Sequence, residues 1–171
     1  MTVIDGFAPI VSRSAQVLIL GSMPSATSLA KQQYYGHPRN AFWQVMGVLV
    51  GAKPELDYQR RKQILLDHHI AVWDVLQSCI RPGSLDASID MNSIKVNDFT
   101  TFFSEYQNIK RVYFNGGAAE KVFVKQVQPE LNDLFCYLEY QRLPSTSPAH
   151  AGMTLEQKIN AWKAILQPVV K

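Results

Sequence analysis

Cysteine is scarce in this chain, and the cysteines present do not form a metal-binding pattern. Only Cys79 and Cys136 occur among the 171 residues, and neither lies at ligand spacing from another cysteine or from a histidine. We interpret both as reduced thiols that pack as small apolar side chains. No segment approaches the ~18 consecutive apolar residues of a membrane span. The N-terminus also lacks the basic and apolar regions of a signal peptide. These absences predict a cytoplasmic protein that does not enter a membrane.

Charge is sparse as well, and the common nucleotide and hydrolase motifs are missing. Charged residues make up 18% of the chain and the net charge is +3, which permits a polyanionic partner without requiring one. The chain has neither the phosphate-loop pattern GxxxxGKS/T nor the dinucleotide fingerprint GxGxxG. It has no GxSxG nucleophile elbow, and Ser145, Ser147 and His150 have no evident partner acid for acyl transfer. An NTPase, a dinucleotide enzyme and a serine hydrolase are therefore disfavoured.

What the sequence does contain is an alternation of short apolar runs with helical patterns. This alternation predicts one α/β domain over residues 1–171 with a mostly parallel sheet. Strands are expected at residues 17–20, 70–76, 111–115 and 135–142. Helices are expected at residues 41–50, 55–69 and 99–106, from residue 118 onward, and after a capping box formed by Thr154 and Gln157. The aromatic residues of 99–106 have the spacing of a buried helix face, so we assign them to the core.

Each expected strand ends in a segment with polar, glycine or proline residues. These segments are Gly21-Ser22-Met23-Pro24-Ser25, Asp74 with Ser78, Asn115-Gly116-Gly117, and Leu143-Pro144-Ser145-Thr146-Ser147-Pro148. Ligands of open parallel sheets bind outside the carboxyl ends of the strands, so we expect these segments to form one site. The long polar gap at residues 81–92 follows the second strand and is expected at the border of that site.

The segment Tyr34-Tyr35-Gly36-His37-Pro38-Arg39-Asn40-Ala41-Phe42-Trp43 is unusual for a core. Aromatic faces can stack on a planar ligand, an Asn amide supplies a neutral donor and acceptor, and an Arg can meet a phosphate. The segment therefore favours a binding pocket. A plainer interpretation also stands for Asn40, which precedes an expected helix and belongs to the residue types that cap helices.

Together these segments resemble the uracil-DNA glycosylase superfamily, and within it the branch that removes hypoxanthine from DNA. The superfamily's first motif, Gly-x-x-Pro, stands here as Gly21-Ser22-Met23-Pro24, and its second motif looks like residues 143–148. The run at residues 37–43 is similar to one shared by the mismatch-specific uracil glycosylases and the hypoxanthine branch. The resemblance implies a three-layer sandwich in which helices flank a central, mostly parallel four-stranded sheet.

The resemblance also implies roles for individual residues. Asn40 matches the catalytic Asn of the hypoxanthine branch, and its amide would position the attacking water and fix the sugar. We expect the base to be bound by Gly21, Ser22, Met23, Pro24, Tyr34, Tyr35 and Asn115, with one of the two tyrosines stacking on it and the Asn115 amide reading its edge. We expect His37, Arg39, Ser145, Thr146 and Ser147 to contact the DNA backbone.

The implied substrate is double-stranded DNA with a flipped damaged base, with single-stranded DNA as a further candidate, and the implied enzyme is a monomer that needs no metal or organic cofactor. The chain departs from the fast uracil enzymes, which carry an Asp in the first motif and a His at the start of the second, where Leu143 stands here. It also lacks the Asn that mismatch-specific members place in the first motif. A strict uracil glycosylase is therefore not expected. A G·U/T mismatch glycosylase, a non-catalytic binder of damaged DNA and an enzyme acting on free nucleosides stay open.

Overall fold

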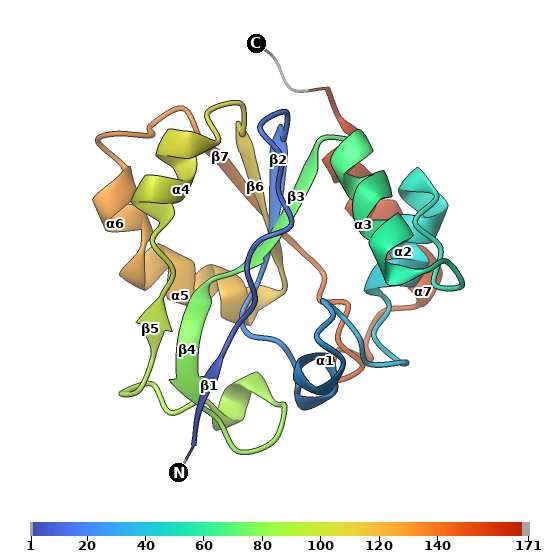
Figure 1. Cartoon of the computed structure of the whole chain (residues 1–171), viewed down its shortest axis with the longest axis horizontal. Helices are drawn as coiled ribbons and strands as arrows, with labels where there is room; N and C mark the ends of the chain where they lie inside the picture. The colour runs from blue at the N-terminus through green and yellow to red at the C-terminus, as the bar shows by residue number, and fades with distance from the viewer. Residues whose placement is uncertain (1, 169–171) are drawn as a thin grey trace.

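The computed structural model describes residues 2–168 and is built around a four-stranded parallel sheet (Figure 1). Its strands are β2 (Val17–Gly21), β3 (Ile70–Asp74), β6 (Arg111–Asn115) and β7 (Glu139–Leu143), in the order β3-β2-β6-β7. All five residues of β2 are buried, as expected for a central parallel strand that is covered on both faces. The fourth strand was expected at residues 135–142 and starts later, because residues 135–138 form a turn before it.

A second, smaller sheet was not predicted from the sequence. It is antiparallel and joins β1 (Val3–Asp5), β4 (Leu76–Ile80) and β5 (Lys95–Val96) in the order β1-β4-β5. The run at 70–76 was expected as one strand, but it divides between the two sheets at Val75. The backbone N–H of Val75 still donates to Gly21 O at 2.8 Å, after which the chain leaves the main sheet. A continuous apolar run does not reveal such a change of sheet.

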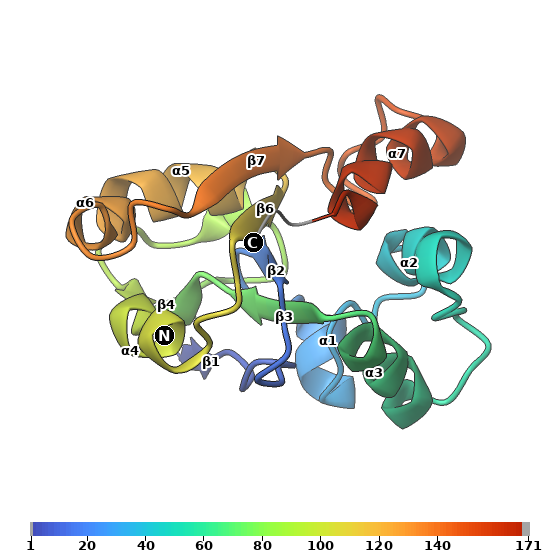
Figure 2. The ribbon, with the colours of Figure 1, turned by 90° about the horizontal axis from the view of Figure 1, so that it is seen from above.

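Helices cover both faces of the main sheet, which gives the expected three-layer sandwich (Figure 2). On one side lie α2 (Phe42–Val50), α3 (Tyr58–Asp67) and α7 (Leu155–Trp162), and on the other α4 (Phe99–Glu105), α5 (Gly117–Gln126) and α6 (Gln128–Leu131). The short helix α1 (Ala26–Lys31) follows β2, and two 3-10 helices occur at Asp86–Ser88 and Lys163–Leu166. Alternate residues of β2 serve the two cores: Ile19 packs toward α2 and α7, and Leu18 packs toward α4 and α5.

The aromatic stripe and the capping box were predicted correctly. Phe99, Phe102 and Phe103 of α4 are buried in the core beneath that helix. The Thr154 side chain accepts a hydrogen bond from the N–H of Gln157, whose side chain accepts one from the N–H of Thr154. Within residues 2–168 no helix has the length and apolar content needed to span a bilayer.

Replacing Ile19 by Ala is expected to destabilise the protein by ~2–5 kcal/mol, because Ile19 is fully buried in the central strand and its removal leaves a cavity. Denaturant unfolding followed by circular dichroism measures this free energy. Val48→Ala is the control, since Val48 is 65% exposed on α2, and it should change stability by less than about 0.5 kcal/mol. Equal effects of the two substitutions would contradict the assigned core.

Candidate active site

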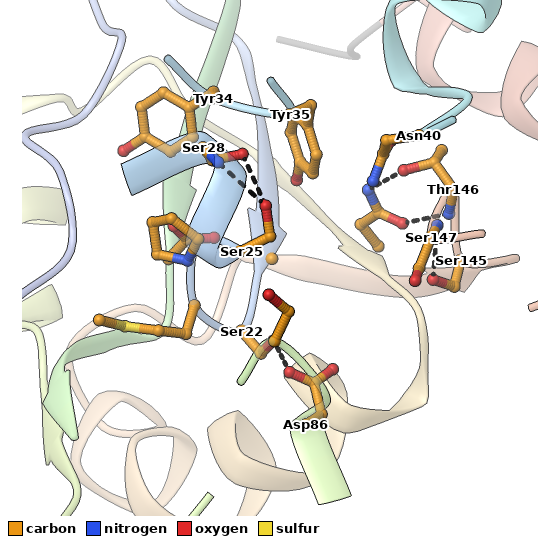
Figure 3. A pocket seen from close by; sticks show the side chains of 16 residues that line it. Ser22, Ser25, Ser28, Tyr34, Tyr35, Asn40, Asp86, Ser145, Thr146 and Ser147 are labelled. Carbon is orange, nitrogen blue, oxygen red and sulfur yellow. Dashed lines mark hydrogen bonds between the residues drawn. The ribbon is translucent and has the colours of Figure 1, made fainter. Parts of the chain in front are cut away.

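A pocket opens at the carboxyl ends of the four parallel strands. It is lined by the loop at residues 21–25 after β2, Asp74 at the end of β3, Asn115 at the end of β6 and residues 145–147 after β7; Ser28, Tyr34, Tyr35, Asn40, Ser84 and Asp86 complete it. Figure 3 shows the labelled side chains of these segments around one common space. The structure thus brings together the strand ends that the sequence predicts, because parallel strands deliver their carboxyl ends to the same edge.

The loop after β2 is held in place from several sides. The N–H of Leu76 donates to Ser22 O at 3.1 Å, and the buried guanidinium of Arg81 donates through Nη2 to Pro24 O at 2.7 Å. The Ser22 hydroxyl donates to Asp86 Oδ1 at 2.6 Å (Figure 3). No hydrogen bond within residues 2–168 uses the N–H groups of Ser22 or Met23. The loop is therefore rigid and keeps two backbone donors for a ligand.

The two adjacent tyrosines have different environments. Tyr34 is 3% exposed; its hydroxyl donates to Ala8 O at 2.8 Å and its ring packs edge-on against Phe7. Tyr35 stacks on Phe42, with ring centroids 4.0 Å apart and an interplanar angle of 20°. Its φ of 54° lies in the left-handed region, where a bulky residue is uncommon and backbone strain concentrates at functional sites. Tyr34 is thus a core residue at the pocket's edge, and Tyr35 is the better placed of the two to meet a ligand.

Asn40 lines the pocket and lies two residues before the start of α2. Its Oδ1 accepts the N–H of Phe42, the first residue of α2, at 2.9 Å, so Asn40 supports the start of the helix, although the N-cap position itself falls on Ala41. No hydrogen bond within the described residues uses its Nδ2, which leaves both N–H donors of the amide available. Next to it, the N–H of Ala41 donates to Thr146 O at 2.9 Å and fastens this segment to the loop after β7. Capping and a role in the pocket are therefore compatible.

Asn115 uses both ends of its amide inside the protein. Its Nδ2 donates to Thr146 Oγ1 and its Oδ1 accepts the N–H of Thr146, each at 2.9 Å. Thr146 is 1% exposed, whereas Ser145 and Ser147 on either side of it are partly exposed. The loop after β7 also lies against Gly116, where a Cβ would come within 2.9 Å of Ser145 Cβ. The Asn115 amide therefore holds this loop, and its expected contact with a ligand stays a prediction.

His37 and Arg39 lie outside the lining of the pocket. The Nδ1 of His37 accepts the N–H of Arg39 at 3.1 Å, so the imidazole folds back onto its own turn. Arg39 is exposed and forms no ion pair with the residues that the structure describes. The polar gap at residues 81–92 borders the pocket as expected, through Ser84 and Asp86.

Asp74 is the residue that sequence reasoning undervalued. It was considered as a strand end together with Ser78, but Ser78 lies in β4 and does not line the pocket. Asp74 is 4% exposed, and burial first, then the nearby charge of Asp86, raises its pKa to about 7, with Arg81 acting in the opposite direction. The signal was present in the sequence Ile-Ala-Val-Trp-Asp, where a charged residue ends an otherwise apolar strand.

Comparison with known proteins finds one matching family model and several similar proteins. A family model described as the uracil DNA glycosylase superfamily matches residues 8–167. A protein of Methanosarcina barkeri named hypoxanthine DNA glycosylase is 38% identical over 113 residues, which is 66% of this chain and 70% of that protein. A protein of the same name from Methanosarcina acetivorans is 31% identical over 163 residues, covering 95% of this chain and 97% of the relative.

A solved structure has the same fold. It is a solution NMR structure from Methanosarcina acetivorans, provisionally named a uracil DNA glycosylase, and it superposes with a TM-score of 0.78. The two chains are 30% identical, and the match covers 96% of each. The likeness therefore extends over nearly the whole chain and includes the segments that line the pocket.

Gly21→Ala is expected to destabilise the protein by about 1–3 kcal/mol, because the new Cβ would lie 2.5 Å from Asp74 Oδ1 and 3.0 Å from the Tyr35 hydroxyl. Denaturant unfolding measures the change. Gly152→Ala is the matched control: nothing lies within 4 Å of its added Cβ, so an effect below about 0.5 kcal/mol is expected. A Gly21→Ala variant as stable as the wild type would show that Asp74 and Tyr35 can move aside, and that the pocket floor is less tightly packed than these distances indicate.

Proposed function

The chain belongs to the uracil DNA glycosylase superfamily, and on that premise we propose that it is a monofunctional glycosylase that excises hypoxanthine from DNA. The observation that carries the proposal is the meeting of Asn40, Tyr35 and the loop after β2 in one pocket. The names of the two Methanosarcina relatives support hypoxanthine as the base. The pocket contains no Lys that could form the Schiff base of a lyase.

A glycosylase reaches its target by turning the nucleotide out of the duplex. We propose that the flipped base stacks against Tyr35, whose ring is itself supported by Phe42 from behind. A base–aromatic contact of this kind is worth about 1–3 kcal/mol in single-strand binders. Tyr34 acts indirectly: its carbonyl accepts the indole N–H of Trp43 at 2.9 Å, which fixes the turn that presents Tyr35.

Hydrolysis of the N-glycosidic bond leaves negative charge on the departing base. The N–H groups of Ser22 and Met23 have no partners within the described residues, and both belong to the anchored loop that lines the pocket. Donors fixed in this way stabilise developing charge without having to reorganise. Met23 and Pro24 would pack along the base, while Gly21 leaves room beneath it.

Asn40 has no proton-accepting group that titrates near neutral pH, so it cannot serve as a strong general base. Its Oδ1 is already committed to the N–H of Phe42. We propose that the remaining Nδ2 holds the attacking water or the sugar oxygen in line with the bond that breaks.

The DNA backbone would be held by the exposed groups around the pocket. Ser145 and Ser147 offer hydroxyls, Arg39 offers an unpaired guanidinium, and His37 shapes the turn that carries Arg39. Thr146 acts indirectly, because its hydrogen bonds to Asn115 hold the loop after β7 in position. Phosphate contacts position the strand and make binding depend on salt.

The direct test is single-turnover cleavage of labelled duplexes that carry one deoxyinosine, uracil, thymine mismatch or xanthine, followed by hot alkali. The proposal predicts scission at deoxyinosine above all other bases. Scission only at uracil or thymine opposite guanine would instead identify a mismatch enzyme. Binding without scission would identify a damage-recognition protein, and cleavage of free inosine that is insensitive to salt would exclude a DNA substrate.

Asn40→Asp is expected to lower the single-turnover rate on deoxyinosine about 10²-fold while DNA binding and folding persist. The Asp oxygen can still cap α2, but the Nδ2 donor is lost. Asn132→Ala, at an exposed position after α6, is the control and should cleave like the wild type. If Asn40→Asp kept full activity while Asn40→Ala lost stability, Asn40 would be a helix cap and nothing more.

A further inference from the structure

The carboxyl group of Asp74 has no hydrogen-bond partner among the residues that the structure describes, although it is buried at the floor of the pocket. Its Oδ2 is inaccessible to solvent and receives no hydrogen bond within residues 2–168. Its Oδ1 lies over Gly21, only 2.5 Å from the position that a Cβ there would take. The Tyr35 hydroxyl, which is also buried and unpartnered in the described chain, converges on the same spot at 3.0 Å from that position. An unpaired buried polar group is costly, so this pair of groups needs an explanation.

The charged and titratable groups around Asp74 favour its neutral form. Asp86, from the 3-10 helix that borders the pocket, adds negative charge. The Tyr35 hydroxyl lies nearby over Gly21, whereas the Tyr34 hydroxyl donates to Ala8 O. Arg81 is the one cation that acts on it, but its guanidinium is directed to the carbonyl oxygens of Pro24 and Gly83. Asp74 forms no ion pair with any residue of the described part of the chain. At neutral pH the carboxyl is therefore present partly as an acid, which can donate a hydrogen bond.

We propose that Asp74 is the general acid of this site and gives its proton to the departing base. This inference rests on the proposed glycosylase function. In the step, the bond between C1′ and the base nitrogen breaks, and the water oxygen bonds to C1′. The base leaves with the Asp74 proton on a ring nitrogen or carbonyl oxygen, and a proton from the water is returned to Asp74 through solvent. The products are free base and an abasic site, so atoms and charge balance.

Three features of the structure support an acid at this place. First, the loop after β2 contains no acidic residue, and of the two carboxyl groups that line the pocket Asp86 already accepts the Ser22 hydroxyl, whereas Asp74 receives no hydrogen bond within residues 2–168. Second, Gly21 is the residue that keeps the path from Oδ1 to the pocket open. Third, a purine offers acceptors at its carbonyl oxygen and its imidazole nitrogen, and both gain basicity as negative charge develops. An ionised Asp74 would oppose that charge, whereas a protonated one neutralises it.

The test is a pH profile of the single-turnover rate on deoxyinosine DNA between pH 5 and 9. With a raised pKa of about 7, Asp74 is protonated below that value and ionised above it. The rate should be level at low pH and fall about tenfold per pH unit above the pKa. Asp74→Asn keeps a hydrogen-bond donor but has no proton to give, so its rate at pH 6 should fall at least about 10²-fold and lose this pH dependence. Asp67→Asn removes an exposed carboxylate from α3 and should leave the profile unchanged.

Asp86→Asn provides a second, electrostatic readout. Removing the negative charge that raises the pKa of Asp74 should move the midpoint of the profile to lower pH. A wild-type enzyme that cleaves deoxyinosine with a flat profile, or an Asp74→Asn variant with the wild-type profile, would overturn the assignment of the acid and leave the proposed function standing. A wild type that cleaves no substrate at any pH would instead overturn the proposed function.

The pKa of Asp74 can also be checked without any activity measurement. A carboxyl with a folded-state pKa of about 7 binds a proton that the unfolded chain has released, so wild-type stability should fall as pH rises from about 4 to 7. Asp74→Asn lacks this penalty and should be the more stable protein at pH 8, with the advantage lost near pH 4. Direct titration of the Asp74 carboxyl carbon by NMR should give the same midpoint. A midpoint below pH 5 would exclude Asp74 as the acid.

Discussion

The parallel pairing of β2 with β3 on one side and with β6 on the other is the constraint on which this site depends. It aligns Gly21 with Asp74 across one ladder and brings Asn115 alongside from the other. Each strand contributes a single residue at its end, and none of the three reaches the pocket by a long side chain. A shift of register by one residue would turn the Asp74 side chain to the opposite face of the sheet. Burial of β2 on both faces prevents that shift, so core packing and site geometry are secured by the same contacts.

Much of the fold could be predicted because its elements carry local signals. Apolar runs of strand length, the aromatic spacing of α4 and the capping box of α7 each contain their own evidence in a few consecutive residues. The small sheet could not be predicted, since β1 and β5 are three and two residues long and form only by pairing with β4. Short strands have too few positions to show an alternation. Their existence is decided by a partner that is distant in the sequence.

The site was predictable as a set of segments but not as a set of contacts. Which segments meet follows from strand direction, and residue types gave the candidates. The sequence could not show that both ends of the Asn115 amide bond to Thr146, or that Tyr34 is more deeply buried than Tyr35. The charged end of an apolar strand marked Asp74 as unusual, but the sequence alone did not rank it above Asn115 as a reactive group. That choice depends on which side chain is left without a partner after folding, and this is a property of tertiary packing.

The hydrogen bond from Ala41 N–H to Thr146 O joins the segment that carries Asn40 to the loop that would hold the DNA backbone. On the proposed roles, this bond links the contact with the DNA backbone to the position of Asn40, which places the water. A substrate without flanking phosphates would not contact the loop after β7. Asn40, which is bonded to that loop through Ala41, would then be held less firmly. Such a substrate would be cleaved more slowly as well as bound more weakly. On these proposed roles, a hydrogen bond between two backbone atoms would favour substrates with flanking phosphates, whichever side chains stand at the two positions.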